Sequence, residues 1–447
     1  MHSQQQPRLQ RYTTILALGL PIIGGMLSQS VLNLIDAVLV GQLGDASLAG
    51  VGIGSYANFV AISLILGLSS AVQTLVARKQ GQGLVEESTK PVLWGILIAC
   101  LFALPLSLLF IHHSESIVAL MTDNSAVQDI AAEYFDYRTA AMLAIGLHLS
   151  FRGWWNGTKR PGTYFKVLIF THVLNVAVSY CLIFGSLGLP RLGAPGAGLG
   201  TAIALYAGVL LNAWLVYKDA KPKGLANWKA KDISSLLSLL KLSIPHSIQQ
   251  LLFSLAICVL FWIIGLLGTS DQAIAHILIN LSLFLILPAV GFGVASTSLV
   301  SHALGEKKSR EAAQWAWDVI TVAVITISIL SLPLWVVPEI VLSAFLQSQS
   351  LIEQATLPLQ LTALAITLDA AAIVLSQSLL GVGASRNVLL ISAVGQWLFY
   401  LPLAWLFGPY LGFGLLGIWN VQLVHRSLSS AVFISIWKQG KWLEIRL

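Results

Sequence analysis

One acidic side chain, Asp36, lies near the end of the first long apolar segment, in the stretch LNLIDAVLVGQLG at residues 32–44. An acidic side chain at the centre of a membrane helix costs about 2.5–3.5 kcal/mol on translocon scales, so an intramembrane Asp is a functional candidate by default. Apolar surroundings also disfavour the charged form of a carboxyl group. We therefore expect Asp36 to bind and release a proton near physiological pH.

Three further polar side chains are expected at a similar depth in the membrane. Asn175 and Ser179 are one helical turn apart and share a face of their helix, and Thr201 lies in the next apolar segment. Amide and hydroxyl groups can donate hydrogen bonds to an ionised Asp36 or accept one from its protonated form. We predict that Asp36 and Asn175 couple proton movement, and that a solute or cation cavity is lined by Gln29, Asn175, Ser179 and Thr201. Structural hydrogen bonding between helices is the alternative for Gln29, Ser179 and Thr201.

The composition indicates a helical protein that crosses a membrane many times. Hydrophobic residues make up 56% of the chain and charged residues 10%, with a mean hydropathy of +0.81, whereas soluble domains carry about 25% charged residues. Apolar runs exceed the roughly 20 residues that a spanning helix needs. We predict an all-α fold with twelve spans, at about 12–40, 48–76, 88–111, 127–150, 164–186, 195–217, 239–267, 273–301, 312–337, 355–380, 387–408 and 413–437.

The basic residues predict the orientation. With both termini in the cytoplasm, all but three of the 25 Lys and Arg residues fall on the inner side, the exceptions being Arg138, Arg191 and Arg426. The net charge of +6 is therefore explained by basic residues that set the orientation in the membrane. No nucleic-acid partner is expected. We expect a monomer in the lipid of a bacterial inner membrane.

The two halves of the chain are internal repeats at an offset of 224 residues. Pro21 recurs as Pro245 and Gly44 as Gly268, and LVARKQGQG at 75–83 matches LVSHALGEK at 299–307. We predict an N-terminal six-helix lobe at 1–217, a cytoplasmic linker at 218–238 and a C-terminal six-helix lobe at 239–447. Six helices per repeat make the repeats parallel, an architecture found in alternating-access transporters. The counterpart of Asp36 is Leu260. The acid is therefore present in the first repeat and absent from the equivalent position of the second.

A proline and two glycines form a weak point in the first span. Pro21 removes a backbone hydrogen bond and clashes with the preceding turn, and Gly24 and Gly25 lie about one helical turn after it. We predict a hinge at these three residues that couples to the protonation of Asp36. A static kink is the open alternative.

The other intramembrane charges have structural interpretations. Asp369 and Arg426 are expected to form a buried ion pair, since a pair is tolerated where either charge alone is not. We also expect Glu133, Asp136 and Arg138 to neutralise one another. No phosphate-binding loop, nucleophile elbow or metal-binding spacing appears. We therefore expect no enzyme activity, no cofactor and no metal site, and transport driven by an ion gradient or by the gradient of the solute.

The chain resembles the multidrug and toxic compound extrusion (MATE) family. The resemblance rests on twelve spans in two repeats, on LIDAVLVGQLG in the first span and on its counterpart WIIGLLG. The DinF-like branch is most similar, because its acid and asparagine match Asp36 and Asn175. The resemblance implies a V-shaped pair of lobes that exports cationic or amphipathic drugs against H⁺ or Na⁺.

Two departures from the family pattern bear on the coupling ion. Ser179 stands where some relatives carry a second acid, and Phe253 stands where NorM-like members carry a glutamate. One carboxylate with neutral oxygens favours a proton over Na⁺. A flippase for lipid-linked precursors, from the same superfamily, is the alternative function. Its cavity should be lined with Arg and Lys, which are scarce in the predicted spans.

The orientation can be tested by cysteine labelling in a variant without the three native cysteines. Gly224→Cys in the linker should stay unlabelled by an impermeant thiol reagent in intact cells, because the linker is predicted to be cytoplasmic. Ser47→Cys and Ser350→Cys should react, because both lie in predicted outer loops. Labelling at position 224 from outside would overturn the span count and the orientation together.

Overall fold

A computed structural model describes residues 7–225 and 233–445. Helices are joined by short turns throughout this part of the chain, and it contains no β-strand. Residues 226–232 of the predicted linker lie outside the described residues. Ten continuous helical stretches in the described part are long and apolar enough to cross a membrane. The remaining two predicted spans, 127–150 and 413–437, correspond to a helix pair and to the last long helix.

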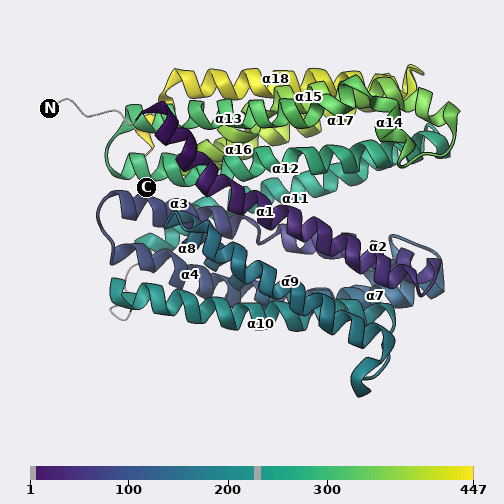
Figure 1. Ribbon diagram of the computed structural model, residues 1–447, viewed down its shortest axis with the longest axis horizontal. Coiled ribbons are helices and arrows are strands. Elements are labelled where there is room, and N and C mark those ends of the chain that lie inside the picture. Colours follow the sequence, from purple (N-terminus) through teal and green to yellow (C-terminus); the bar gives the residue numbers. More distant parts are fainter. Residues whose placement is uncertain (1–6, 226–232, 446–447) are drawn as a thin grey trace. The chain divides into compact units, whose positions relative to one another are not determined.

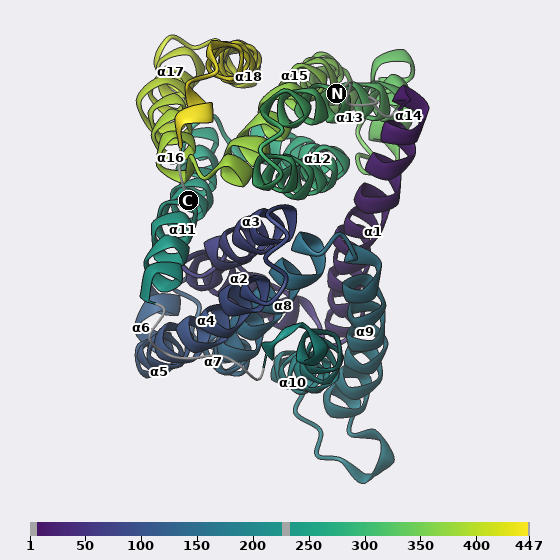
Figure 2. The ribbon, with the colours of Figure 1, turned by 90° about the vertical axis from the view of Figure 1, so that its left-hand side faces the viewer.

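The first half of the chain forms ten α-helices, several of which combine into one span. They are α1 (Arg8–Gly41), α2 (Asp45–Ser63), α3 (Gly67–Gly81), α4 (Lys90–Ile98), α5 (Leu104–His112), α6 (Ser114–Ala119), α7 (Ser125–Ala140), α8 (Met142–Gly157), α9 (Pro161–Phe184) and α10 (Ala194–Ala220). In this half α9 packs along α10, and α3 packs along α8 (Figures 1 and 2).

The second half repeats the pattern with longer unbroken helices. They are α11 (Ile233–Gly265), α12 (Thr269–Gly305), α13 (Ser309–Val336), α14 (Pro338–Ser343), α15 (Gln349–Val382), α16 (Ser385–Ala393), α17 (Leu401–Trp405) and α18 (Gly414–Gln439). Helix α15 packs against α12, α13 and α18 and forms the centre of this half.

Prolines account for three interruptions, which lie inside two of the spans. A proline cannot donate to the carbonyl one turn earlier and its ring crowds that turn. Wider π-helical turns relieve this strain. One such turn at Ala99–Ala103 directly precedes the helix that contains Pro105, another at Val394–Tyr400 precedes Pro402, and a third contains Pro409.

The described chain divides into two compact units whose limits fall inside helices. One unit combines the residues up to Ile23 with those from Leu251 onward, and the other runs from Gly24 to Gln250. The start of α1 thus packs with the second half of the chain, and the start of α11 packs with the first half. The lobes predicted from the linker, 1–217 and 239–447, have other limits than these two compact units. That division stays a prediction.

Two glycine contacts show how the start of α1 and the start of α11 pack in their compact units. Gly67 at the start of α3 donates its backbone N–H to Ser247 Oγ of α11 at 3.0 Å, and a Cβ at Gly67 would lie 2.7 Å from the Ser247 backbone nitrogen. At the repeat offset, Gly291 of α12 packs against Ile23 of α1, where a Cβ would lie 3.3 Å from the backbone nitrogen. Both contacts need a residue without a side chain, and they occupy equivalent positions in the two repeats.

The repeat is also visible in the turns that open α2 and α12. Gly44 precedes α2 with a φ of 106°, and Gly268 precedes α12 with a φ of 124°. Only glycine adopts such angles without strain. The recurrence of these glycines, predicted from the sequence, therefore has a backbone cause.

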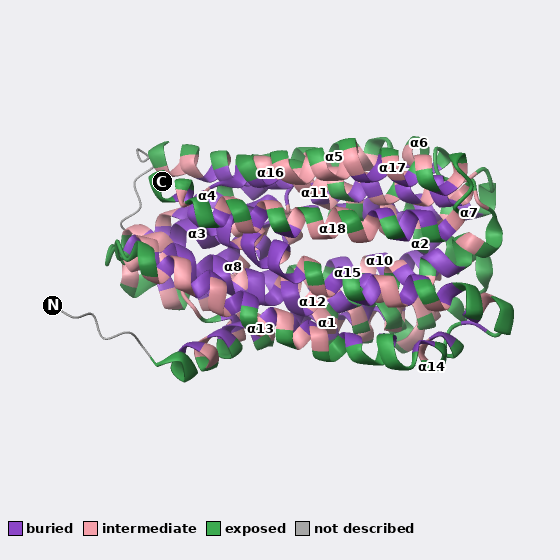
Figure 3. Ribbon diagram, turned by 90° about the horizontal axis from the view of Figure 1, so that it is seen from above, coloured by how far each residue is buried: buried purple, intermediate pink, exposed green. Residues whose placement is uncertain are grey.

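Each unit has its own apolar core. In the first half the largest cluster of buried residues gathers around Trp154 and Phe151 of α8 and includes Leu239 and Leu242 of α11. In the second half the cluster runs along α12 and α15. Figure 3 shows α3 and α8 mostly as buried residues, whereas the outer helices alternate between buried and exposed positions.

The glycine contact between α3 and α11 can be tested by stability measurements. Gly67→Ala should lower the thermal unfolding temperature of the purified protein, because overpacking of a tight contact costs about 1–3 kcal/mol. Gly52→Ala is the matched control, since a Cβ at Gly52 has open space around it. Gly291→Ala should behave like Gly67→Ala. Equal unfolding temperatures for the Gly67→Ala and Gly52→Ala variants would show that the contact is not tight.

Candidate functional site

Three of the predicted site residues form one buried hydrogen-bonded cluster between α9 and α10. Asn175 Nδ2 donates to Thr201 Oγ1 at 2.8 Å, and Ser179 Oγ donates to Asn175 Oδ1 at 3.2 Å. Thr201 Oγ1 in turn donates to the carbonyl of Ala197 at 2.8 Å. Each of the three predicted side chains is at most 5% exposed. The cluster is thus satisfied internally, and it locks α9 to α10.

Glycine at position 200 allows this close approach. A Cβ at Gly200 would lie 2.7 Å from the Cα of Ser179. The backbones of α9 and α10 therefore nearly touch at this level, which brings Thr201 within hydrogen-bond distance of Asn175. In the sequence, the glycine directly before Thr201 is the local signal for this close approach of α9 and α10.

Asp36 lies on α1 without a hydrogen-bond partner. Its side chain is half-buried, and its Oδ1 atom is fully buried with no partner among the described residues. The hydrogen bonds expected from Asn175 and Thr201 to the carboxyl are not formed in this arrangement, because those side chains bind each other. The structure therefore brings Asn175, Ser179 and Thr201 together but does not bond Asp36 to them.

Arg138 of α7 is the one described charge whose electrostatic attraction reaches Asp36. Its side chain is half-buried, and its Nε atom is buried without a partner in the described part of the chain. The expected neutralisation of Arg138 by Glu133 and Asp136 is wrong, because no ion pair joins them within residues 7–225. Residues two apart on a helix do not face each other, so Asp136 points elsewhere. Arg138 is a candidate functional residue that sequence reasoning had assigned to a local cluster.

Gln29 connects α1 to α9. His172 Nε2 donates to Gln29 Oε1 at 3.2 Å, and Gln29 Nε2 donates to Asn33 Oδ1 at 3.1 Å. The Gln29 side chain is exposed while His172 is buried. Its position on the same helix as Asp36 fits a cavity residue, and its bond to His172 also fits the structural alternative.

The predicted hinge lies where α1 passes from one compact unit to the other. Helix α1 is continuous through Pro21, and the limit of the units falls between Ile23 and Gly24. Gly24 and Gly25 pack against α9, where added Cβ atoms would lie 3.2 Å from Phe165 and 3.1 Å from Leu168. The two glycines thus serve close packing in this arrangement. Their role as a hinge stays a prediction.

The predicted ion pair of the second half is confirmed. Arg426 Nη1 of α18 donates to Asp369 Oδ2 of α15 at 2.5 Å. Both side chains are largely buried, so each charge compensates the other in a position where a lone charge is costly.

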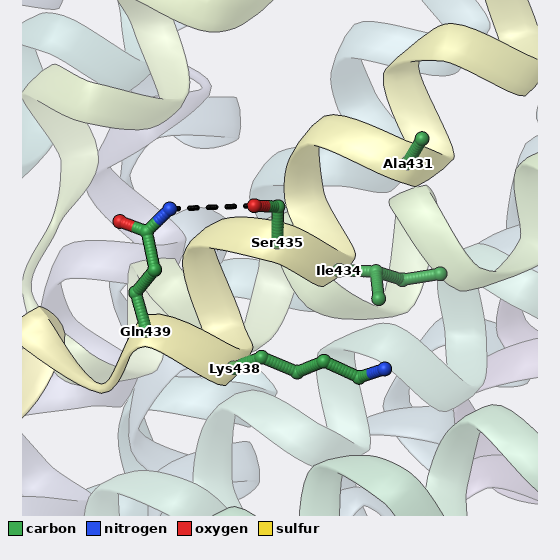
Figure 4. A pocket seen from close by; sticks show the side chains of 5 residues that line it. All are labelled: Ala431, Ile434, Ser435, Lys438 and Gln439. Carbon is green, nitrogen blue, oxygen red and sulfur yellow. Dashed lines mark hydrogen bonds between the residues drawn. The ribbon is translucent and has the colours of Figure 1, made fainter.

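The second half also has a shallow hollow of about 580 Å³. It is lined by the last turns of α18, at Ala431, Ile434, Ser435, Lys438 and Gln439, and Gln439 donates to Ser435 at 3.3 Å (Figure 4). None of the predicted site residues lies there. Among the described residues, no group of three or more His, Cys, Asp or Glu side chains could hold a metal ion.

Curated relatives are similar to the chain over nearly its whole length. The probable multidrug resistance protein NorM of Bradyrhizobium diazoefficiens is 27% identical, with 94% of this chain and 92% of the relative covered. The protein of the same name from Thermotoga maritima is 22% identical, with 96% and 92% covered.

Solved structures share the fold. A MOP superfamily transporter from Pyrococcus furiosus, described as having a binding pocket of reverse polarity that suggests a different function, superposes with a TM-score of 0.89 at 19% identity, covering 98% of this chain and 97% of that one. A mutant of the Vibrio cholerae MATE transporter VcmN gives a TM-score of 0.89 at 20% identity, with 97% and 98% covered.

The family model matches both repeats. It covers residues 21–181 and again residues 245–406, so the two matches begin at Pro21 and at its repeat counterpart Pro245. Together with the superposed structures, these matches confirm the predicted all-α fold of two six-helix repeats. The assignment to a DinF-like branch stays a prediction. Because this family model matches most of the length of the chain, the chain belongs to the MatE family, the multidrug and toxic compound extrusion transporters.

Proposed function

We propose that this chain is a secondary active exporter that moves cationic or amphipathic organic compounds out of the cell in exchange for protons. Asp36 is the coupling carboxylate in this proposal, and Na⁺ is the less favoured ion. The names of the curated relatives, probable multidrug resistance proteins, support the substrate class. No cofactor is required, and the protein acts as a monomer in the bacterial inner membrane with both termini in the cytoplasm.

The observation that carries the proposal is the unpartnered oxygen of Asp36. Burial of Oδ1 without a hydrogen bond disfavours the ionised carboxyl, whereas the attraction of Arg138 favours it. Two opposing influences of this kind keep the charged and neutral forms close in free energy. A carboxyl group in that condition can exchange a proton, and it can also bind a cationic solute in its charged form.

The neighbouring oxygens support a proton over Na⁺. Hard cations prefer several oxygen ligands around one centre. Asn175 Oδ1 and Thr201 Oγ1 already accept hydrogen bonds, from Ser179 and from Asn175, and the Thr201 hydroxyl donates to the backbone of Ala197. None of these side chains bonds to Asp36, and a single carboxylate makes a poor Na⁺ site.

The coupling role of Asp36 can be tested by drug efflux. Asp36→Asn should reach the membrane and keep its fold, because Asp36 makes no hydrogen bond that holds helices together. It should nevertheless lose active efflux of ethidium from cells that lack their native exporters. Asn175→Ala is the comparison variant and should reduce efflux less, since it leaves the carboxylate in place. Full drug resistance from a well-expressed Asp36→Asn variant would sink the proposal.

The coupling ion can be identified in drug-loaded proteoliposomes. Transport by the unmodified chain should follow an imposed pH gradient and be indifferent to replacement of Na⁺ by choline. The Asp36→Asn variant should show no response to the pH gradient. Transport that follows Na⁺ at constant pH would reverse the choice of ion and would require Asn175, Ser179 and Thr201 to rearrange around a cation.

A further inference from the structure

A cluster of buried hydrophobic residues lies beside the candidate site. Its members come from five helices of the unit that runs from Gly24 to Gln250: Val40 of α1, Val51 of α2, Tyr134 of α7, Ile183 of α9, and Ala194 and Ala197 of α10. A Cβ at Gly198 would lie 3.0 Å from the carbonyl oxygen of Tyr134, so α7 and α10 nearly touch here. The cluster therefore fixes the level at which these five helices meet.

The next helical turn toward the middle of these helices is polar. Residues four apart share a face of a helix and lie about 6 Å apart along its axis. Because consecutive spans alternate in direction, this turn comes four residues before the cluster on α1 and α9 and four residues after it on α7 and α10. The side chains at these positions are Asp36 on α1, Arg138 on α7, Ser179 on α9 and Thr201 on α10. Ser179 and Thr201 are joined through Asn175, which confirms their common level, and Arg138 shares this polar layer with Asp36.

Asp36 and Arg138 are the two charges of the polar layer, and neither has a direct partner. Asp36 Oδ1 and Arg138 Nε are fully buried, and neither side chain forms a hydrogen bond or an ion pair with another residue of the described ranges. Arg138 nevertheless attracts the carboxylate of Asp36 across the layer. A nearby positive charge favours the ionised form of a carboxyl group. Arg138 therefore stabilises ionised Asp36 without occupying its oxygens, which stay available to a proton or to a cation.

The other helices around Asp36 add no further charge to its surroundings among the described residues. α9 and α10 face it with the uncharged side chains of the polar layer, and α2 adds an apolar one. His172 of α9 contacts α1 two turns away from Asp36. On α7, Glu133 acts electrostatically on Asp136. Arg138 is thus the described charge that sets the electrostatics of the carboxyl group.

The second repeat lacks both charges. At the offset of 224 residues Asp36 corresponds to Leu260 and Arg138 to Thr362. Leu260 is part of the apolar core of the second half, and Thr362 accepts a hydrogen bond from Trp419 Nε1 at 2.7 Å. The equivalent positions of the second repeat are thus packed without a charge. The two charges are present together in one repeat and absent together from the other, as expected if they act on each other.

We propose that Arg138 is the internal counter-ion of Asp36 and limits how tightly the carboxylate holds a proton or a cationic solute. Arg138 acts through Asp36 and does not itself carry the proton. An exchanger must release each of its two ligands in turn, so a carboxylate that held either one too tightly would slow the cycle. This inference rests on the proposed export function and adds the residue that sets the strength of its coupling site.

The protonation of Asp36 can be followed directly by infrared spectroscopy. The carboxylic acid C=O band of the purified full-length protein is recorded as a function of pH, and the spectrum of Asp36→Asn is subtracted to isolate this group. Arg138→Gln should move the midpoint of the Asp36 band to higher pH, because loss of the positive charge makes the neutral carboxyl group relatively more stable. The shift should be about one pH unit, the lower end of the effect of an opposite charge, since the two groups form no direct ion pair.

Three further variants separate the effect of the charge from other effects. Arg138→Thr introduces the side chain found at the equivalent position of the second repeat and should shift the midpoint like Arg138→Gln, so the test does not depend on the folding of one neutral variant. Arg138→Lys retains the positive charge and should restore a midpoint near that of the unmodified protein. Arg191→Gln removes an exposed arginine that does not act on Asp36 and should change nothing.

Transport kinetics give a second readout. In proteoliposomes, at a pH above the midpoint of every variant, Arg138→Gln should lower both the KM for ethidium and kcat. A carboxylate without its counter-ion binds the cation more tightly and releases it more slowly. A variant that had only lost structure would show a lower kcat without a lower KM.

An unchanged midpoint in both neutral variants would overturn the inference, and so would an Asp36 band that does not titrate while the protein stays folded. An Arg138→Lys variant with the midpoint of Arg138→Gln would also overturn it, because the charge would then not be the cause. If the midpoint shifts as expected but Asp36→Asn retains full efflux, Arg138 is established as the counter-ion and the proposed export mechanism alone fails.

Discussion

A charge inside an apolar layer has a high free-energy cost. This cost divides the charged residues of this protein into those that have an ion pair and those that do not. Arg426 with Asp369, and Arg11 with Asp318, offset that cost with ion pairs. Asp36 and Arg138 form no such pair, and each has a buried polar atom without a partner among the described residues. The compensated charges belong to the scaffold, and the uncompensated ones are where a proton or a solute completes the electrostatics.

Around Asp36, the side chains that hold the helices together are different from the carboxyl group that changes its charge. Helices α9 and α10 are joined by the cluster of Asn175, Ser179 and Thr201, and α1 is attached to α9 through Gln29 and His172. The carboxyl group contributes to none of these bonds. Its charge can therefore change without breaking a structural hydrogen bond, which suits a group that must cycle in every round of transport.

Much of the fold was predictable because repeats and membrane spans leave strong signals. The offset of 224 residues identified Gly44 and Gly268, which the structure shows at backbone angles that favour glycine. The ion pair of Asp369 with Arg426 was predictable because two opposite charges were alone in their half of the membrane. The proximity of Asn175 and Thr201 followed from their expected depth along adjacent helices.

Side-chain direction and helix ends were not predictable in the same way. Arg138 was assigned to a local cluster because sequence spacing ignores which way side chains point around a helix. Hydropathy ended the fourth predicted span at about residue 150, whereas the helix continues to Gly157. The bonds that keep Asn175 and Thr201 occupied with each other depend on the closeness of two backbones at Gly200, which only the packed structure shows.

The exchange of helix segments between the two halves has a consequence for synthesis. The first turns of α1 are made first, yet their packing partners around Gly291 and Asp318 appear only after most of the chain has left the ribosome. At roughly 5–20 residues per second, that segment waits many seconds in the membrane before its contacts exist. A half-length chain would lack one such partner altogether, and two copies could supply it to each other. The fold of the single chain thus has the form of a domain-swapped dimer whose subunits have been joined.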